Sequence, residues 1–263
     1  MPTACALSLM LDNLMSDNQQ EQNGDWTALG HYQLLKGLVF DDKDTAKLSL
    51  ESLSSDSGDK LQLSVDGRPG YRAAPVIAGA ISTPAIPKRL LQEYKSHGVS
   101  GRDSYQQGPL FHGPGLQLLT SLAIKESQLL ASVSLPANAR DFGDFSGRKN
   151  RVCALDAILQ GALVLAHNLS GQDSLPVGFA QLAVNKQLDS FSEGRLWLHN
   201  ATLMGNSFQC DASLFADTGE TLAVVKGVKL TLSTTRLNAS GQSQAVESKR
   251  TAQQESAVVE NAN

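Results

Sequence analysis

With 263 residues, the chain is long enough for one large domain or two small ones, each able to bury its own core. Its 41% hydrophobic and 18% charged residues and its net charge of -4 are typical of a globular protein, and nothing in this balance favours nucleic acid or an anionic membrane as a partner. The three cysteines, Cys5, Cys153 and Cys210, lack the spacing of a zinc site, which favours buried free thiols in a reducing cytoplasm over a disulfide.

The first half of the chain predicts one helix followed by strands. Residues 2–15 are expected to be helical because Leu7, Leu11 and Leu14 recur at helical spacing and mark a buried stripe. Since this helix begins almost at the first residue, we expect that the chain has been cut from a longer polypeptide. After a polar loop, β-rich or alternating segments and an Asp-Gly turn signal predict strands at 31–40, 47–53, 61–65 and 71–81.

The second half repeats this plan of helix and antiparallel strands. Residues 82–107 carry prolines and glycines without a periodic pattern, and we interpret them as a connector. A turn rich in glycine and proline begins at Gly108, and a loop is expected at 136–150. Beyond Thr235 the composition is too polar to fold, which predicts a disordered tail or linker. The regular elements expected here are an apolar helix at 152–169 and strands at 116–124, 129–135, 175–184, 195–203, 208–215 and 221–233.

The helix at 152–169 is apolar on nearly every side, which places it in the middle of a domain. Asp156 and Gln160 interrupt it at a spacing of four residues, so both side chains lie on one face, one turn apart. A carboxylate is rarely buried unless it is paired, hydrogen-bonded or protonated. By themselves, these two residues indicate either a structural hydrogen bond or a site of chemistry.

The polar pair also leaves no stretch of the ~20 uninterrupted apolar residues that a membrane span needs. The N-terminus lacks the basic start and the cleavage site of a signal peptide, so a cytoplasmic location is predicted. The sequence contains no GxSxG nucleophile elbow, no phosphate-binding glycine loop, and no His/Cys/Asp cluster with metal spacing. We therefore expect neither a cofactor nor a metal.

Three motifs resemble those of polyketide-synthase dehydratase domains, and they occur in the same order and at similar spacing. FHGPGLQ at 111–117 resembles the YGPxF-type motif, DAILQ at 156–160 resembles the DxxxQ motif, and LPV at 175–177 resembles the LP segment that follows. Together with HYQLLKGLVFDD and RPGYRA, these residues look most similar to the dehydratase-like domain of the large bacterial polyunsaturated fatty acid synthase subunit. The resemblance covers roughly residues 1–233.

This resemblance implies an α+β double hotdog, in which two antiparallel sheets are each wrapped around a central helix. The first hotdog would span residues 1–92, the second 93–235, and the tail 236–263. The implied activity removes water from 3-hydroxyacyl thioesters on an acyl carrier protein and gives 2-enoyl products. The implied partners are that carrier protein, with its phosphopantetheine-bound acyl chain, and other domains of a multienzyme synthase; a homodimer is left open.

The resemblance makes Asp156 the acid that protonates the departing C3 hydroxyl, while a histidine removes a proton from C2. Apolar neighbours, Leu155, Ile158 and Leu159, would raise the pKa of the Asp156 carboxyl by desolvation. Gln160 would orient that carboxyl or bind the substrate hydroxyl. The substrate-binding residues implied by the same motifs are Phe111, His112, Gly113, Pro114 and Pro176.

One part of the family pattern is missing. The catalytic histidine of the family lies in an HxxxGxxxxP motif whose final proline matches Pro2, so it would precede Met1. Either the domain is truncated or its parent never had the residue, and we expect little or no dehydration by this polypeptide alone. His112 takes a position that is usually aromatic in the family, which favours a polar residue of the channel wall over a substitute base.

Whether the domain is an enzyme is therefore open at this point. The rival to a dehydratase is a non-catalytic, dehydratase-like module that binds the carrier protein or the acyl chain inside a megasynthase. A hotdog thioesterase is a third alternative, because the same fold can place a carboxylate for attack by water and fold alone does not settle chemistry.

Overall fold

The computed structural model describes residues 3–16, 25–36, 47–54, 58–76, 85–106, 108–136, 143–233, 236–237 and 243–244. The predicted helix and strands of the first half are confirmed, although the first strand begins earlier than expected. The predicted strand residues 37–40 and 77–81 lie outside the described residues. These elements are α1 (Thr3–Ser16), β1 (Trp26–Leu34), β2 (Leu48–Leu53), β3 (Lys60–Val65) and β4 (Arg68–Val76).

The second half contains every helix and strand predicted for it and several short elements that were not. The long elements are β6 (Leu119–Lys125), β7 (Gln128–Ser134), α4 (Lys149–Ser170), β8 (Asp173–Asn185), β9 (Glu193–Met204), β10 (Ser207–Ala216) and β11 (Thr221–Ser233). The short ones are α2 (Lys88–His97), β5 (Val99–Ser100), α3 (Arg102–Gln106), η2 (Pro114–Leu116), η3 (Gly143–Arg148), η4 (Lys186–Ser190), β12 (Arg236–Leu237) and β13 (Ser243–Gln244).

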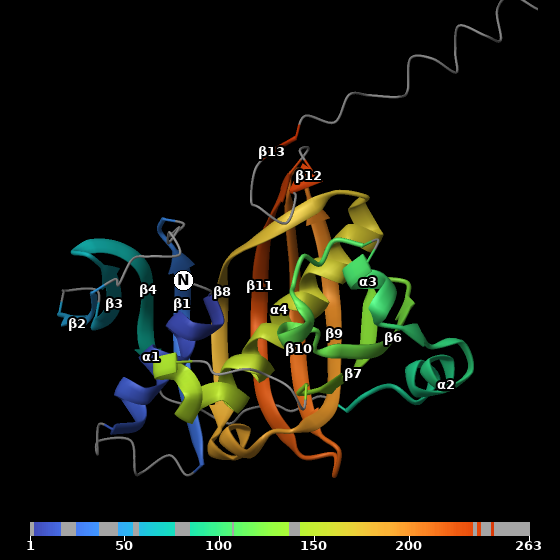
Figure 1. Ribbon diagram of the computed structural model, residues 1–263, viewed down its shortest axis with the longest axis horizontal. Helices are drawn as coiled ribbons and strands as arrows, with labels where there is room; N and C mark the ends of the chain where they lie inside the picture. The colour runs from blue at the N-terminus through green and yellow to red at the C-terminus, as the bar shows by residue number, and fades with distance from the viewer. Residues whose placement is uncertain are drawn as a thin grey trace, which may run out of the picture.

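Strands β1 to β11 form one antiparallel sheet in the order β2-β3-β4-β1-β8-β11-β10-β9-β7-β6-β5 (Figure 1). An α+β architecture with antiparallel strands is thus confirmed. The two expected sheets are, however, joined edge to edge, because β1 pairs with β8 from Trp26 opposite Asn185 to Gln33 opposite Gly178. In the predicted tail, β12 and β13 pair with each other, and the other residues of 236–263 lie outside the described residues.

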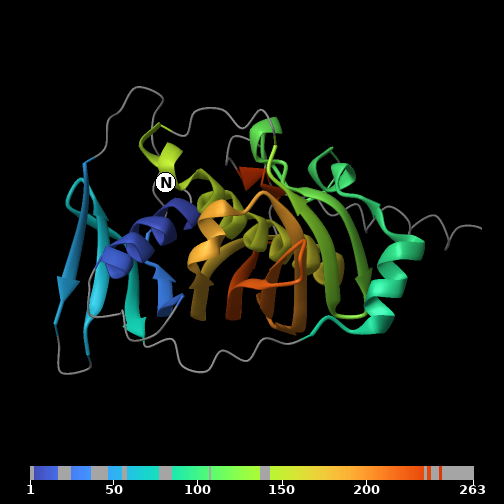
Figure 2. The same ribbon diagram turned by 90° about the horizontal axis from the view of Figure 1, so that it is seen from below.

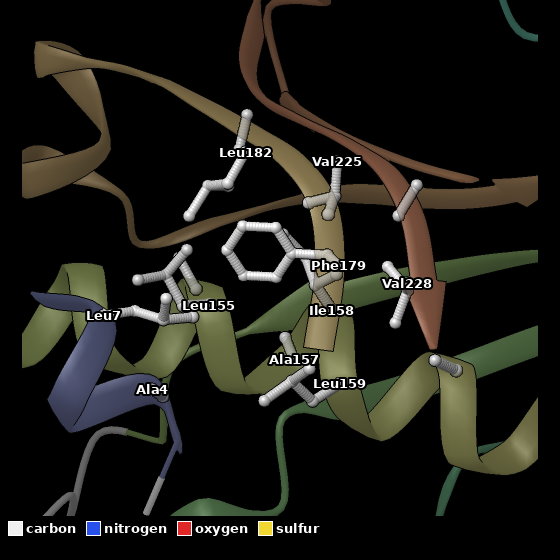
Figure 3. Close-up of a cluster of buried hydrophobic side chains, with 14 of the residues drawn as sticks. Ala4, Leu7, Leu155, Ala157, Ile158, Leu159, Phe179, Leu182, Val225 and Val228 are labelled. Atoms are coloured by element: carbon white, nitrogen blue, oxygen red, sulfur yellow. The ribbon is translucent and has the colours of Figure 1, made fainter. Parts of the chain in front are cut away.

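Two helices pack against the same side of this sheet. Helix α1 contacts β1, β3 and β4, whereas α4 contacts β6 to β11, and the two helices contact each other (Figure 2). Their apolar side chains form one continuous core with the strands. Figure 3 shows Leu7 of α1 beside Leu155 of α4, near Phe179 and Leu182 of β8. The site discussed below lies on α4, close to this junction of the two helices.

The sequence of α4 explains its central position. Most of its residues are buried, as the all-round apolar pattern predicts. Gly161 allows a close approach to β9, since a Cβ there would lie 2.6 Å from a methyl group of Leu196. The helix ends at Gly171, whose φ of 69° and N–H bond to the His167 carbonyl form a left-handed cap. Among the described residues, the helical segment Phe145–Ser170 has the length and the mean hydropathy, 1.5, of a membrane span. However, 78% of its most apolar 18-residue stretch is buried inside the protein.

The interpretation of residues 82–107 as a connector is wrong, because most of the residues that the structure describes in this range form helices or a strand. Helix α2 lies there, on the outer face of β6 and β7 and opposite to α4 (Figure 2). Its apolar side chains are few, and Leu90 packs with Leu130, Trp197 and Phe215 in a small second core. Such a short amphipathic helix between prolines and glycines lacks the long periodic pattern on which the sequence prediction relied.

Candidate active site

Asp156 and Gln160 lie one turn apart on α4, as their spacing predicts, and they are hydrogen-bonded. Gln160 Nε2 donates to Asp156 Oδ2 at 2.7 Å. The two side chains differ in their access to solvent: Gln160 is fully buried, whereas the Asp156 side chain keeps 13% of its surface exposed. The carboxyl is therefore the group of this pair that a ligand can reach.

The amide of Gln160 is held by two further partners. Its Nε2 also donates to the Leu116 carbonyl at 2.8 Å, and its Oε1 accepts from the Tyr105 hydroxyl at 2.6 Å. Tyr105 comes from α3, and its hydroxyl in turn accepts from the Leu119 N–H at 2.8 Å. Burial raises the pKa of Tyr105 to about 12, so the hydroxyl stays protonated and donates. These bonds fix the orientation of the amide and, through it, that of the Asp156 carboxyl.

The surroundings of Asp156 favour its protonated form. Burial raises the pKa of the carboxyl above its ordinary value, and this effect outweighs the opposing influence of His112 and of the Gln160 hydrogen bond. Desolvation is the cause that the apolar neighbours in the sequence predict. A carboxyl that holds its proton near neutral pH can act as a general acid.

His112 lies next to Asp156, in the turn between α3 and η2. Its Nε2 is 3.5 Å from Asp156 Oδ2, and its side chain is 12% exposed. Burial lowers the pKa of the imidazole, and the nearby Asp156 carboxyl only partly offsets this effect. The ring stacks on Phe111 with centroids 5.0 Å apart, and Gln117 Nε2 donates to the His112 carbonyl. Burial thus favours the neutral imidazole, which lies beside a carboxyl whose pKa is raised.

The other predicted site residues surround this group less closely. Phe111 is 50% exposed, and Pro114 opens the η2 turn after Gly113. A Cβ on Gly113 would meet no atom within 4 Å, so this glycine borders open space. Pro176 lies in β8 opposite Leu230 of β11 and, in the described part of the chain, takes no part in the hydrogen bonds around Asp156.

Helix α1 also reaches this region. The charge of Asp156 adds to burial in raising the pKa of Cys5 on α1 and of Cys153 on α4, each to about 11. Both are therefore neutral thiols near the carboxyl. All three cysteines are free and buried, which confirms the predicted state of the thiols but does not bear on the compartment.

A buried arginine fixes α1 relative to α4. Arg151 Nε and Nη2 bind the two carboxylate oxygens of Asp189 in η4, and Nη1 binds Asp12 of α1. Arg148 also pairs with Asp12. The bidentate pair and the second carboxylate hold the guanidinium in one orientation. This network explains how the short α1 keeps its place beside the N-terminal turns of α4.

A cavity of about 430 Å³ lies near the other end of α4. Its lining includes Val99, Leu122 and Ile124 on the sheet side and Val164 and His167 on α4. Asp156, Gln160 and His112 are not part of this lining. The cavity is thus distinct from the carboxyl site. Within the described ranges, the His, Cys, Asp and Glu side chains form no group of three that could hold a metal.

Tyr105 and the carbonyl of Leu116 belong to the site but were missed by sequence reasoning. Tyr105 lies in the segment that we interpreted as a connector, 55 positions before Gln160. No local pattern marks it, because α3 has five residues and none of them is fully buried. Leu116 contributes only its backbone, and any residue type supplies a carbonyl.

Comparison with solved structures shows the fold of polyketide-synthase dehydratase domains. The dehydratase domain of RzxB from Pseudomonas fluorescens is 19% identical, with a TM-score of 0.67 over 87% of this chain and 84% of that one. A trans-AT polyketide-synthase dehydratase domain from Brevibacillus brevis is 16% identical, with a TM-score of 0.68 over 88% and 85%. A trans-acyltransferase polyketide synthase enoyl-isomerase is 15% identical, with a TM-score of 0.68 over 87% and 89%.

Comparison of the sequence identifies a family but no individual curated relative. No curated protein matches the chain. The family profile described as "Polyketide synthase dehydratase N-terminal domain" matches residues 82–239, which is more than half of the chain. The matched segment carries both Asp156 and the turn with His112, so the resemblance of these motifs is confirmed at the level of the family. The chain belongs to the polyketide synthase dehydratase family.

Proposed function

We propose that the protein is a dehydratase that removes water from a 3-hydroxyacyl thioester bound to an acyl carrier protein. The observation that carries this proposal is the Asp156 carboxyl: burial raises its pKa, Gln160 fixes one of its oxygens, and its side chain still keeps 13% exposure. A base removes a proton from C2 of the substrate, and Asp156 protonates the C3 hydroxyl. The C3–O bond then breaks, water leaves, and the 2-enoyl thioester remains.

Gln160 acts in this proposal through Asp156. Its amide binds Oδ2 and is itself fixed by Tyr105 and the Leu116 carbonyl. Among the described residues, no donor binds the second oxygen, Oδ1. We assign Oδ1 to the substrate hydroxyl, because it is the oxygen that remains open after Gln160 has positioned the other.

The remaining motif residues are proposed to guide the acyl chain. The exposed ring of Phe111 and the open space beside Gly113 suit a substrate entrance, with Pro114 fixing the backbone of the turn. Pro176 of β8 is proposed as a more distant contact. The proposed partners are an acyl carrier protein, whose phosphopantetheine arm delivers the acyl chain, and other domains of a multienzyme synthase, with a homodimer left open.

We also propose that the sheet is organised as two hotdog halves, residues 1–92 around α1 and 93–235 around α4, followed by a tail at 236–263. The contacts of each helix with its own group of strands support this division. A cytoplasmic location is proposed with it, in keeping with free thiols at Cys5, Cys153 and Cys210.

The test is to incubate the protein with a 3-hydroxyacyl thioester on a phosphopantetheinylated acyl carrier protein and to follow the acyl group by mass spectrometry. Because the family's histidine motif is not in this chain, we expect little water loss from the wild type, and we expect Asp156→Asn to abolish any that occurs. Asp217→Asn is the matched control, because Asp217 is exposed in a distant turn. Turnover that survives Asp156→Asn would refute the assignment. Release of a free acid would favour a thioesterase, and carrier binding without any reaction would favour a non-catalytic module.

A further inference from the structure

The cavity near the C-terminal end of α4 has the size of a site for a small molecule. Its volume of about 430 Å³ lies within the range of roughly 300–1,000 Å³ that is usual for ligand pockets. It is open to solvent, because Val99 and Asn168 in its lining are exposed. Water that fills the cavity touches apolar side chains, and covering such surface is favourable. An occupant with an apolar body would gain that free energy.

The inner part of the lining is apolar. Leu122 and Ile124 of β6 and Val164 of α4 line the cavity, and all three belong to the main hydrophobic core or pack against it. Pro109 and the 54% exposed Val99 of β5 extend this surface outward. The core of the protein thus continues into the cavity, which suits a hydrocarbon group.

The wall opposite α4 is formed by α3, which lies beside β6 (Figure 1). Just before α3, the Gly101 N–H donates to the Thr120 carbonyl at 3.0 Å. After it, the Leu110 N–H donates to the Ser104 carbonyl at 3.1 Å, and Gly108 allows this close return because a Cβ there would lie 2.7 Å from the same oxygen. These backbone bonds hold the wall in place before a ligand arrives, which lowers the cost of binding.

The charges at the mouth of the cavity favour a cation. The ionisable side chains in the lining are Asp103 and His167. His167 lies 3.5 Å from Asp173, so a charge on the imidazole has its own counterion. Asp103 is exposed on α3 and, in the part of the chain that the structure describes, forms no ion pair. The C-terminal end of α4, next to Asn168, adds the partial negative charge of helix carbonyls.

We propose that this cavity is a second ligand site for a small molecule that has an apolar body and a protonated amine. The hydrocarbon part would cover Leu122, Ile124 and Val164, and the ammonium group would lie at the mouth beside Asp103. The proposal does not rest on the proposed dehydration, because Asp156 and the side chains around it lie outside this lining.

The occupant would act on the element that positions Gln160. Asp103 and Ser104 line the cavity, and the next residue of α3, Tyr105, donates to Gln160 Oε1 at 2.6 Å. Helix α3 has five residues, none of which is fully buried, and such segments open locally at a low cost in free energy. A ligand that contacts α3 and α4 at once would hold them together and so stabilise the bond between Tyr105 and Gln160.

The test uses three probes with the same chain length and different head groups: hexylamine, 1-hexanol and hexanoate. Thermal unfolding of the full chain is followed at rising concentrations of each probe, with sodium chloride added to match the ionic strength, and the shift in Tm gives the affinity. We expect hexylamine to bind about tenfold more tightly than hexanoate, with 1-hexanol between them. Equal shifts with all three probes, tighter binding of hexanoate, or no shift at all would overturn the proposal.

Two variants test the residues of the site. Asp103→Asn should remove the preference for hexylamine and leave the affinity for 1-hexanol unchanged, whereas Asp217→Asn, the matched change in an exposed distant turn, should keep the preference. Val164→Phe fills the cavity and should weaken the binding of every probe by about tenfold or more. If Val164→Phe does not fold, Asp103→Asn still decides the case, because an unchanged preference in that variant would refute the role of Asp103.

Hydrogen exchange of the backbone amides shows where the probe binds. Hexylamine should slow exchange in α3 and in the C-terminal half of α4, and it should leave β2 and β3 of the first half unchanged. Protection spread evenly over the chain, or confined to the first half, would mean adsorption elsewhere and would sink the proposal. These measurements need no substrate, so their failure would leave the proposed dehydration untouched.

Discussion

The hydroxyl of Tyr105 is expected to stabilise the fold and the site together, which Tyr105→Phe tests. This change removes one oxygen atom and two hydrogen bonds, the one donated to Gln160 Oε1 and the one accepted from the Leu119 N–H. Each partner is then left without its bond in the interior, at a cost of roughly 1–3 kcal/mol. We therefore expect a loss of about 3 kcal/mol in the free energy of unfolding. At roughly 2–4 °C per kcal/mol for a domain of this size, Tm should fall by about 6–12 °C.

The assay is equilibrium unfolding in urea, followed by circular dichroism, with thermal unfolding alongside it. Ser213→Ala is the control, because the Ser213 hydroxyl is buried without a hydrogen-bond partner among the described residues, and its removal should cost little. A second comparison combines Tyr105→Phe with Gln160→Leu in a double-mutant cycle, where the two effects should be strongly non-additive. If Tyr105→Phe costs no more than Ser213→Ala, or if the two effects simply add, the hydrogen-bond argument is wrong.

Three further predictions concern the packing and the charges around α4. Arg151→Met leaves Asp12 and Asp189 without their shared cation and should cost roughly 1.5–3 kcal/mol, because both carboxylates stay partly exposed and Asp12 keeps Arg148; α1 should become the first segment cut in limited proteolysis. Gly161→Ala places a Cβ 2.6 Å from Leu196 and should cost roughly 1–3 kcal/mol in urea unfolding; unchanged stability would show that β9 yields easily. Because the folded state raises the pKa of Asp156, the stability from its protonated form is present at acid pH and is lost as the pH rises through the raised value. Asp156→Asn should therefore lose less stability than the wild type between acid and neutral pH, and parallel curves would contradict this.

The sequence predicted the parts of the fold whose pattern is local. The helix expected at 152–169 became α4, because a long run of apolar residues has few alternatives to a central helix. Likewise, the alternation of apolar and polar residues predicts β2 and β3, and the Asp66-Gly67 turn signal predicts the hairpin that follows β3. What could not be predicted was the join between β1 and β8, because no pattern in either strand states which edge it will meet.

The candidate site also has one part that the sequence predicts and another that it does not. The pairing of Asp156 with Gln160 follows from helical geometry, and the hydrogen bond between them confirms that both side chains share one face. Tyr105 and His112 reach this pair from a short helix and from a turn, across 55 residues in the case of Tyr105 and Gln160. Such long-range contacts depend on how the turns fold over α4, and residue spacing does not encode that.

The β1–β8 pairing also bears on how this chain can be divided in the laboratory. The segment that carries the family match, 82–239, includes β8 but not β1. Expressed alone, it would expose a long row of unpaired N–H and C=O groups along β8, from Gly178 to Asn185, which is the kind of edge on which other chains add strands and aggregate. A fragment intended for crystallisation should therefore keep β1 to β4, even though the residues proposed for chemistry lie entirely in the second half.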